Sequence, residues 1–460
     1  MYRKSTYLFI VNSINRVLNF LLRIVLRAVL GVEGFGTIAV ILPIQNLILT
    51  ITSYAISPSV SKYVSEDEAK GGLRDLYPFL FIPLGLVLFL LGYLMAPSFA
   101  SFLSEDFGQE IVTPLRVMFL GIPFGVIFSI FSGIFFGKQL ARKVAYSLLI
   151  VQASTIVLAY LMGLSMGVSG AVLSFFLAYV VGTFFLLTPV ARQMAKWSVD
   201  WGRGRQMIRF SLPILVTSLA IVSIFQVDIV VLGRYYTTYE TSLYGLVTPT
   251  ARLIPAFSIA LSTMLLPKLS SLKVNNFHDE IERTLSKAFD VGFTVSLPFS
   301  LLIFSFSREI LFVLFDSTEA TRSLMILSIG MLFYSLYYLL SSSLQGLGKP
   351  RVPMYILSFC ALLDVALCFA LIPGSSIDGA ATATAISMGV AFILVFLYIR
   401  PKKMPRLANV LSVIPLIAFE RMVGVLDGKA TTFAVYMSVG LIYLFLYNRY
   451  NGTLDVLRNE

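Results

Sequence analysis

Histidine and cysteine are scarce in this chain, which limits the chemistry available to it. His278 is the only histidine among 460 residues and lies in a predicted cytoplasmic loop, which argues against a histidine-based metal or acid–base site. Cys360 and Cys368 lie eight residues apart on one apolar segment. A helix would separate them by about 12 Å, which is too far for a disulfide. We interpret both cysteines as packing residues.

A nucleotide-binding P-loop is missing as well. The nearest approximation, from Gly133 to Lys138, has the wrong spacing and no serine or threonine after the lysine. The chain is therefore not expected to hydrolyse nucleotides. Its predicted outer loops are too short for a catalytic domain, so a polyprenyl-dependent glycosyltransferase is disfavoured and no enzyme activity is expected.

Charged residues are few, at 13%, whereas 57% of the residues are hydrophobic. This composition is typical of an all-α polytopic membrane protein. Hydropathy predicts fourteen transmembrane helices. Their predicted ranges are 5–30, 37–62, 77–100, 111–137, 141–163, 169–190, 207–232, 242–267, 284–306, 320–347, 351–372, 378–399, 407–426 and 430–448.

The basic residues orient these spans. With the N-terminus inside, the inner segments hold 25 lysines and arginines, whereas the outer segments hold 3, namely Arg234, Arg308 and Lys429. The positive-inside rule then places both termini in the cytoplasm of a multi-pass protein of the cell membrane. It also explains most of the net charge of +11, so no nucleic-acid partner is needed. Seven basic residues lie within or at the ends of spans: Arg16, Arg23, Arg27, Arg116, Arg252, Arg322 and Arg421.

An internal repeat divides the chain into two parallel halves. Gly36 matches Gly245 and Pro58 matches Pro267, both at an offset of 209, and Val168–Ala171 matches Ile377–Ala380 at the same offset. Phe136–Lys138 matches Leu347–Lys349 at an offset of 211. We predict an N-terminal lobe at 1–190, a cytoplasmic linker at 191–206, a C-terminal lobe at 207–400 and a two-helix appendix at 401–460.

The first span carries a polar stripe on one helical face. Its members are Asn12, Arg16, Asn19, Arg23 and Arg27, which extend over about 22 Å at about 1.5 Å per residue. A charge in hydrocarbon costs at least about 2.5–3.5 kcal/mol. The stripe is therefore expected to meet water, a partner or an anion. The alternatives are that Arg27 reaches the lipid headgroups and that Arg16 pairs with an acidic residue, Asp228.

Several motifs resemble a known transporter superfamily. The segments Leu26–Gly36 and Ser57–Glu66 look like the start of polysaccharide transporters and of relatives of stage V sporulation protein B. The segments Ala251–Pro255 and Leu265–Ser270 resemble the eighth span of lipid II flippases. The chain is thereby identified as a member of the multidrug/oligosaccharidyl-lipid/polysaccharide exporter superfamily. The resemblance implies two six-helix lobes that face a central cavity.

The resemblance also implies roles for individual residues. In the superfamily, arginines of the first and eighth spans hold the substrate's diphosphate, and the matching residues here are Arg16, Arg23, Arg27 and Arg252. The second and eighth spans are expected to move during transport, and each contains two prolines: Pro43 and Pro58 in the second, Pro249 and Pro255 in the eighth. They are hinge candidates, and static kinks are the alternative.

Some relatives bind sodium in the second lobe. The matching positions here are Asp228, Asp364 and Thr384 (or Thr382), but Cys360 stands where an asparagine ligand is expected. A thiol is a poor ligand for a hard cation. There are two alternatives for these carboxylates. One is a proton site, and the other is a structural pair between Asp228 and an arginine.

The predicted function is outward flipping of a polyprenyl-diphosphate-linked saccharide by alternating access. A monomer surrounded by membrane lipids is expected, with no cofactor other than a coupling ion. Sodium, protons and the membrane potential are alternative energy sources. A cation-coupled multidrug and toxin extrusion antiporter is the alternative function, but it would favour an acidic cavity over the basic one predicted here.

Overall fold

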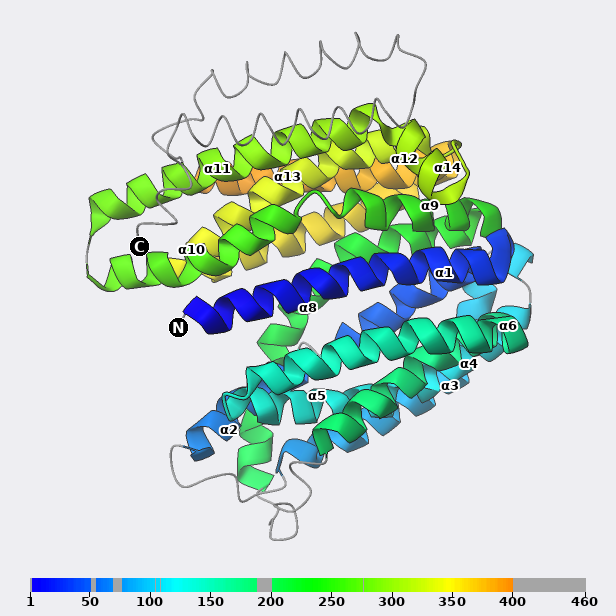
Figure 1. Cartoon of the computed structure of the whole chain (residues 1–460), viewed down its shortest axis with the longest axis horizontal. Helices are drawn as coiled ribbons and strands as arrows, with labels where there is room; N and C mark the ends of the chain where they lie inside the picture. The colour runs from blue at the N-terminus through cyan, green and yellow to red at the C-terminus, as the bar shows by residue number, and fades with distance from the viewer. Residues whose placement is uncertain are drawn as a thin grey trace. The chain divides into compact units, whose positions relative to one another are not determined.

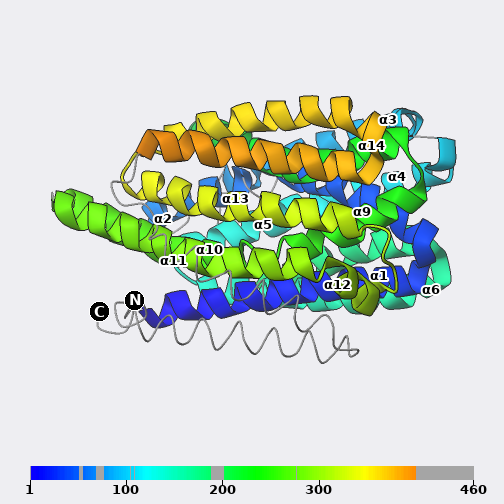
Figure 2. The ribbon, with the colours of Figure 1, turned by 90° about the horizontal axis from the view of Figure 1, so that it is seen from above.

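The computed structural model is helical throughout the part it describes, which comprises residues 2–50, 55–68, 77–103, 105–107, 109–187, 201–275 and 277–399. Within these ranges some side chains, including those of Asn12 and Arg16, are not described. The predicted spans at 407–426 and 430–448 lie outside the described residues. Figures 1 and 2 show the helices.

The chain divides into two compact units, which are described separately. Unit 1 comprises Met1–Leu246 and Cys368–Ile377, and unit 2 comprises Val247–Leu367 and Asp378–Glu460. The described helices of unit 1 are α1 (Tyr2–Leu49), α2 (Ala55–Glu68), α3 (Ile82–Phe102), α4 (Val112–Leu120), α5 (Ile122–Gly137), α6 (Ala141–Leu187) and α8 (Trp201–Tyr235), with the first part of α9 (Thr238–Ala251). Short 3₁₀ turns lie at Tyr77–Phe81, Glu105–Phe107 and Gln109–Ile111.

Unit 2 contains the end of α9 and the helices that follow it. These are α10 (Ala256–Val274), α11 (His278–Ser305), α12 (Ser307–Phe315), α13 (Thr321–Gly346) and most of α14 (Arg351–Ile399). Seven described helices are long and apolar enough to cross a membrane, or eight if the bent pair α9–α10 forms one span. A multi-pass helical membrane protein is thereby confirmed, whereas the count of fourteen spans stays a prediction.

Single residues replace three of the predicted loops. Gly31 in α1, Gly167 in α6 and Ser376 in α14 have non-helical backbone angles, while helix continues on both sides. At about 1.5 Å per residue, α6 and α14 would each extend about 70 Å if straight, more than twice the thickness of the hydrocarbon core. Each break therefore allows one long helix to supply two spans.

The breaks follow the sequence repeat. Gly167 and Ser376 both have positive φ and lie 209 residues apart, as do Gln139 and Gly348. The backbone thus aligns Gly348 with Gln139, so the offset of 211 assigned to this stretch from the sequence is wrong by two residues. Two other boundaries also differ, because the predicted span 37–62 is divided between α1 and α2 and the span 111–137 between α4 and α5.

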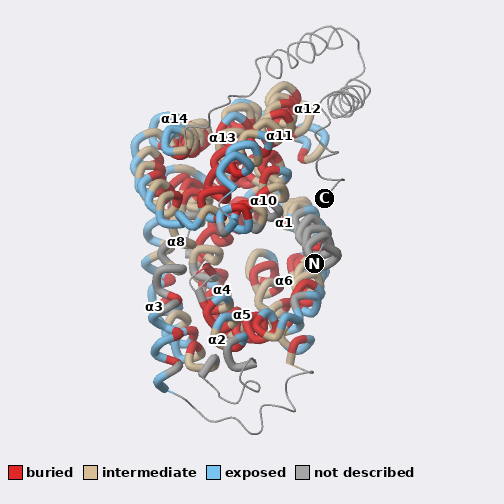
Figure 3. The backbone as a smooth tube through the Cα atoms, turned by 90° about the vertical axis from the view of Figure 1, so that its left-hand side faces the viewer, coloured by how far each residue is buried: buried red, intermediate tan, exposed pale blue. Residues whose placement is uncertain are grey.

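Small residues allow close helix packing within each unit. In unit 1, a methyl group on Gly133 or Gly137 of α5 would lie 2.7 Å from Val60 or Val64 of α2, respectively. This four-residue spacing is the small-residue pattern common at membrane helix contacts. In unit 2, Ser258, Ser296 and Ser335 form a buried ring of hydroxyls, the serine ring, with Oγ–Oγ distances of 2.6–3.2 Å. Figure 3 shows the buried residues between helices and the exposed residues along α3.

Candidate functional site

The arginine stripe of α1 does not lie on the lipid-facing side of that helix. Among the described side chains of this segment, Ile14, Val17 and Leu21 are large, apolar and exposed, whereas Leu22 and Leu26 are buried. At about 100° per residue, Arg23 lies closer to the buried face than to the exposed apolar face, whereas Arg27 lies about midway between them and reaches inward to Ser242. Both arginines are half-buried. The guanidinium groups are therefore turned toward the protein interior.

Arg27 contacts α9 across unit 1. Its Nη1 donates a hydrogen bond of 2.6 Å to the Oγ of Ser242. Within the described residues no carboxylate forms an ion pair with Arg27. A guanidinium has five N–H donors, and a neutral hydroxyl leaves its charge uncompensated. Arg27 is therefore equipped to bind an anion.

The acidic residue nearest in sequence to Ser242 is occupied elsewhere. The carboxylate of Glu240 accepts hydrogen bonds from both the backbone N–H and the hydroxyl of Thr237, and the Thr237 hydroxyl accepts from the N–H of Tyr239 at 3.2 Å. This is a capping box, which satisfies backbone donors at the start of α9. The box holds the Glu240 carboxylate at the helix terminus rather than against Arg27.

Helices α1 and α9 come into very close contact beside this site. A methyl group on Gly36 would lie 1.8 Å from the backbone oxygen of Thr238, so only glycine fits here. The Thr241 hydroxyl lies 3.2 Å from the Gly36 oxygen and 3.0 Å from the Thr238 oxygen, so it can donate across the contact or within α9. Gly245, the repeat equivalent of Gly36, lies at the same crossing, where a methyl group would be 2.9 Å from the Cβ of Ala39. Two equivalent positions of the repeat thus permit one helix crossing.

An acidic loop residue fixes the start of α9. Asp106 accepts hydrogen bonds from the backbone N–H of Thr238 at 2.8 Å and from its hydroxyl at 3.0 Å. A carboxylate at a helix N-terminus is favoured by the helix dipole. This contact joins the loop after α3 to the helix that presents Ser242.

Asp228 is buried in α8 and binds a tyrosine. Its side chain is 2% exposed, one carboxyl oxygen accepts the Tyr244 hydroxyl at 2.7 Å, and the other accepts the N–H of Ile229 at 2.8 Å. The predicted alternative partner, Arg16, has a side chain outside the described set. Asp228 is therefore held by α9, at least in part.

The remaining predicted residues lie in unit 2. Arg252 follows the end of α9, is half-buried and lies in a break where α9 and α10 bend by 45° between Pro249 and Pro255. On α14, Asp364 and Thr384 are fully buried, and the Thr384 hydroxyl has no hydrogen-bond partner within the described part of the chain. No cluster of three potential metal-binding His, Cys, Asp or Glu residues occurs among the described positions.

The other candidates of the stripe and of the hinges differ in their burial. Asn19 and Pro58 are exposed, and Pro43 is buried inside α1. Sequence reasoning missed Ser242 and Tyr244, which bind the predicted residues Arg27 and Asp228, and Thr238, which lies against Gly36 at the helix crossing. Only the Thr237–Glu240 spacing, which is a capping-box pattern, could have marked the start of α9 in the sequence.

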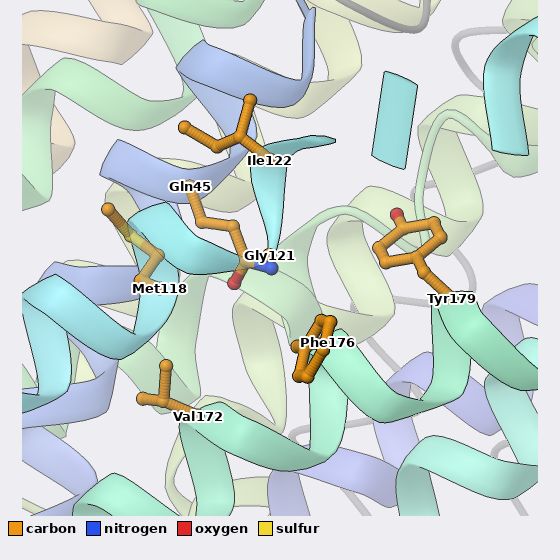
Figure 4. Close-up of a pocket in the computed structure, with 7 residues that line it drawn as sticks. All are labelled: Gln45, Met118, Gly121, Ile122, Val172, Phe176 and Tyr179. Atoms are coloured by element: carbon orange, nitrogen blue, oxygen red, sulfur yellow. The ribbon is translucent and has the colours of Figure 1, made fainter. Parts of the chain in front are cut away.

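A small pocket lies elsewhere in unit 1, at the junction of α4 and α5. Its cavity volume is about 10 Å³, which is room for about one water molecule. Figure 4 shows the seven residues that line it: Gln45, Met118, Gly121, Ile122, Val172, Phe176 and Tyr179. The Oε1 of Gln45 is enclosed and has no hydrogen-bond partner in the described structure. The pocket shares no residue with the arginine stripe.

Two family models match the chain. The model described as "Polysaccharide biosynthesis protein" covers residues 1–273, and the MatE model covers residues 213–370. An uncharacterized membrane protein of Methanocaldococcus jannaschii is 26% identical over 87% of this chain and 98% of its own length. Stage V sporulation protein B of Bacillus subtilis is 25% identical over 83% of this chain and 80% of its own length. A probable low-salt glycan biosynthesis flippase of Haloferax volcanii is 26% identical over 42% of this chain and 41% of its own length.

Solved structures show the same fold. Lipid II flippase MurJ in an inward closed conformation superimposes with a TM-score of 0.81 at 16% identity, covering 98% of this chain and all of that one. An inward-facing multidrug resistance MATE family transporter of the MOP superfamily has a TM-score of 0.72 at 16% identity, covering 84% of this chain and 94% of that one. Since the first family model spans more than half of the residues, the chain belongs to the polysaccharide biosynthesis protein family of membrane proteins.

Proposed function

We propose that this protein flips a polyprenyl-diphosphate-linked oligosaccharide or polysaccharide precursor from the inner to the outer leaflet. The observation that carries the proposal is Arg27, a half-buried guanidinium whose hydrogen-bond partner is the neutral Ser242 hydroxyl. A planar guanidinium binds phosphate oxygens in a bidentate manner and stays charged at any working pH. The family match and the flippase relative support the same substrate class.

The rest of the stripe extends this anion site. Asn12, Arg16, Asn19 and Arg23 share the α1 face, and Arg252 is the proposed contribution of the second half. Diphosphate would bind these groups, while the polyprenyl tail remains in the hydrocarbon. An inside-negative potential favours outward movement of anions by about 2.3 kcal/mol per charge per 100 mV.

Alternating access requires the α1–α9 contact to open and close. Positive-inside topology assigns this contact to the outer half of the membrane, so its opening would release substrate outward. In this proposal two lobes, at 1–190 and 207–400, move about the candidate hinges Pro43, Pro58, Pro249 and Pro255. The predicted helices in 401–460 complete a fourteen-helix monomer with both termini in the cytoplasm and provide a groove for the lipid tail.

Ion coupling is a separate part of the proposal. Asp228, in unit 1, and Asp364 with Thr384, in unit 2, are the candidates for binding Na⁺ or H⁺. The enclosed Thr384 hydroxyl without a partner supports a ligand role. Asp364→Asn should abolish any stimulation of flipping by a sodium or proton gradient. Flipping driven by the membrane potential alone would be insensitive to this change.

An antiporter of organic cations is the second candidate, because the MatE model matches residues 213–370. Cation binding requires an acidic or aromatic cavity, whereas the α1 stripe is basic. Export of organic cations by vesicles containing the intact protein, without flipping of lipid-linked saccharide, would establish the antiporter and contradict the proposal.

The decisive experiment measures flipping of a polyprenyl-diphosphate oligosaccharide in reconstituted vesicles. A hydrogen bond to a charged group contributes about 1.5–3 kcal/mol, so Arg27→Gln should reduce flipping at least about tenfold. The double variant Arg23→Gln/Arg252→Gln should reduce it further. Arg322→Gln is the matched control, since its side chain is 81% exposed beside Asp378. Wild-type flipping by the Arg27 and double variants would refute the mechanism.

A further inference from the structure

One side of α3 is turned away from the rest of the protein and carries exposed apolar side chains. Leu86, Leu90, Leu94 and Met95 are all exposed, with Leu94 at 65%. The small residues Gly85, Gly92 and Ala96 of the same helix are buried. A helix that exposes long apolar side chains in a membrane protein faces lipid tails.

A positive charge lies at the edge of this apolar surface. The guanidinium carbon of Arg116, on α4, lies 4.9 Å from the centroid of the Tyr93 ring on α3. This is a cation–π contact. The Tyr93 side chain is 39% exposed, so the pair lies at the protein surface rather than in a helix interface.

Among the residues that the structure describes, Arg116 has no polar partner. Its Nε is enclosed and has no hydrogen-bond partner, and no carboxylate pairs with it in the described part of the chain. Its two terminal nitrogens are not among the enclosed atoms. Leaving a charge unpaired within a membrane costs several kcal/mol, so a ligand that neutralises it is favoured.

The position of Arg116 in α4 sets the depth of this charge. It lies four residues, or about 6 Å, from the first residue of the helix, Val112. Helical side chains tilt toward the N-terminus, which is the outer end of α4 in the predicted topology. The first turn of α4 contains no acidic residue, so no carboxylate of that turn neutralises Arg116.

We propose that Arg116 and Tyr93 bind the phosphodiester group of an anionic phospholipid in the outer leaflet. The phosphate oxygens accept hydrogen bonds from the terminal guanidinium nitrogens, while Tyr93 holds the guanidinium plane. The acyl chains cover the exposed apolar side of α3. Nothing in this assignment depends on the proposed transport substrate, and the site shares no residue with the α1 stripe.

Arg234 provides a matched control for this site. It too lies over an aromatic ring of α3, with its guanidinium carbon 5.4 Å from the Phe102 centroid. However, its Nη1 donates a hydrogen bond of 2.8 Å to the Phe102 backbone oxygen. Arg234→Gln thus removes a stacked surface arginine whose polar partner is supplied by the protein itself.

The test is retention of phosphatidylglycerol by the purified full-length protein in native mass spectrometry. Arg116→Gln should reduce retention about tenfold, and Arg116→Lys should reduce it less, because lysine keeps the charge but loses bidentate geometry. Arg234→Gln should match the wild type. Diacylglycerol, which lacks phosphate, should be retained poorly, and inorganic phosphate should not displace phosphatidylglycerol.

Three results would overturn the proposal. One is equal retention of phosphatidylglycerol by the wild type and both Arg116 variants. The second is equal retention of diacylglycerol, which would show that binding depends on the apolar surface of α3 and not on the phosphate group. The third is displacement by inorganic phosphate at matched concentration, which would indicate a free-anion site. If Arg116→Gln does not fold, Arg116→Lys must by itself show at least a threefold loss.

Discussion

Replacing Gly36 by alanine would force α1 and α9 apart. The added methyl group would lie 1.8 Å from the Thr238 backbone oxygen, and both atoms belong to helices that cannot relieve the overlap by changing a rotamer. The helices must separate by about 1 Å or more before the methyl group reaches a normal contact distance. Overpacking of this kind costs about 1–3 kcal/mol.

Two hydrogen bonds across the same contact would weaken with it. These are the bond of 3.2 Å from Thr241 to the Gly36 oxygen and that of 2.6 Å from Arg27 to Ser242. Interhelical hydrogen bonds in membranes contribute about 0.6 kcal/mol each on average. We expect the packed arrangement to lose about 2–4 kcal/mol in total, which reduces its population relative to an opened state about 30- to 700-fold.

Cysteine labelling measures this opening. Ser242 is fully buried, so Ser242→Cys should react slowly with a membrane-impermeant maleimide. The native Cys360 and Cys368 are also fully buried and need not be removed. The Ser242→Cys variant already lacks the Arg27 hydrogen bond, so in this background the overlap at position 36 supplies most of the effect. Adding Gly36→Ala should still accelerate labelling at least tenfold, whereas Gly374→Ala should not, because nothing lies within 4 Å of a methyl group there. Equal labelling of the two folded variants would refute the reasoning.

Three further changes test individual contacts by their effect on unfolding. Tyr244→Phe should cost about 1.5–3 kcal/mol, because the buried Asp228 carboxyl loses a hydrogen bond of 2.7 Å; an unchanged thermal midpoint would contradict this. Ser296→Ala should cost about 1 kcal/mol in chemical unfolding, because it removes two bonds of the serine ring; no loss would mean that the ring does not stabilise unit 2. Ser376→Gly should raise the thermal midpoint by relieving about 1 kcal/mol of strain at φ 48°, since Gly167 adopts φ 60° at the equivalent position; a lower midpoint would show that the serine is not strained.

Helix content was predictable because it depends on local apolar runs. A stretch of about 20 apolar residues specifies a span without reference to the rest of the chain. The repeat was also readable, and Gly167 and Ser376 occupy equivalent breaks in the backbone. The short loops expected after the first, fifth and eleventh spans were wrong, since helix continues up to a single break at Gly31, Gly167 or Ser376.

Partners distant in sequence were not predictable. Ser242 lies 215 positions from Arg27, and nothing local to either residue indicates the hydrogen bond. Asp228 was singled out because an intramembrane carboxylate is rare, but Tyr244, which binds it, looks like any aromatic residue of a span. The functional roles of the arginines, prolines and carboxylates stay predictions.

The crossing at Gly36 and Gly245 has a consequence for descent by gene duplication. If the two halves were once separate copies that paired with each other, a single glycine codon would have supplied both small residues of the crossing. After fusion the two codons mutate independently, so neither copy can compensate for loss of the other. Before fusion, one substitution could have created this crossing. After fusion, selection must keep glycine at two positions for the crossing to persist.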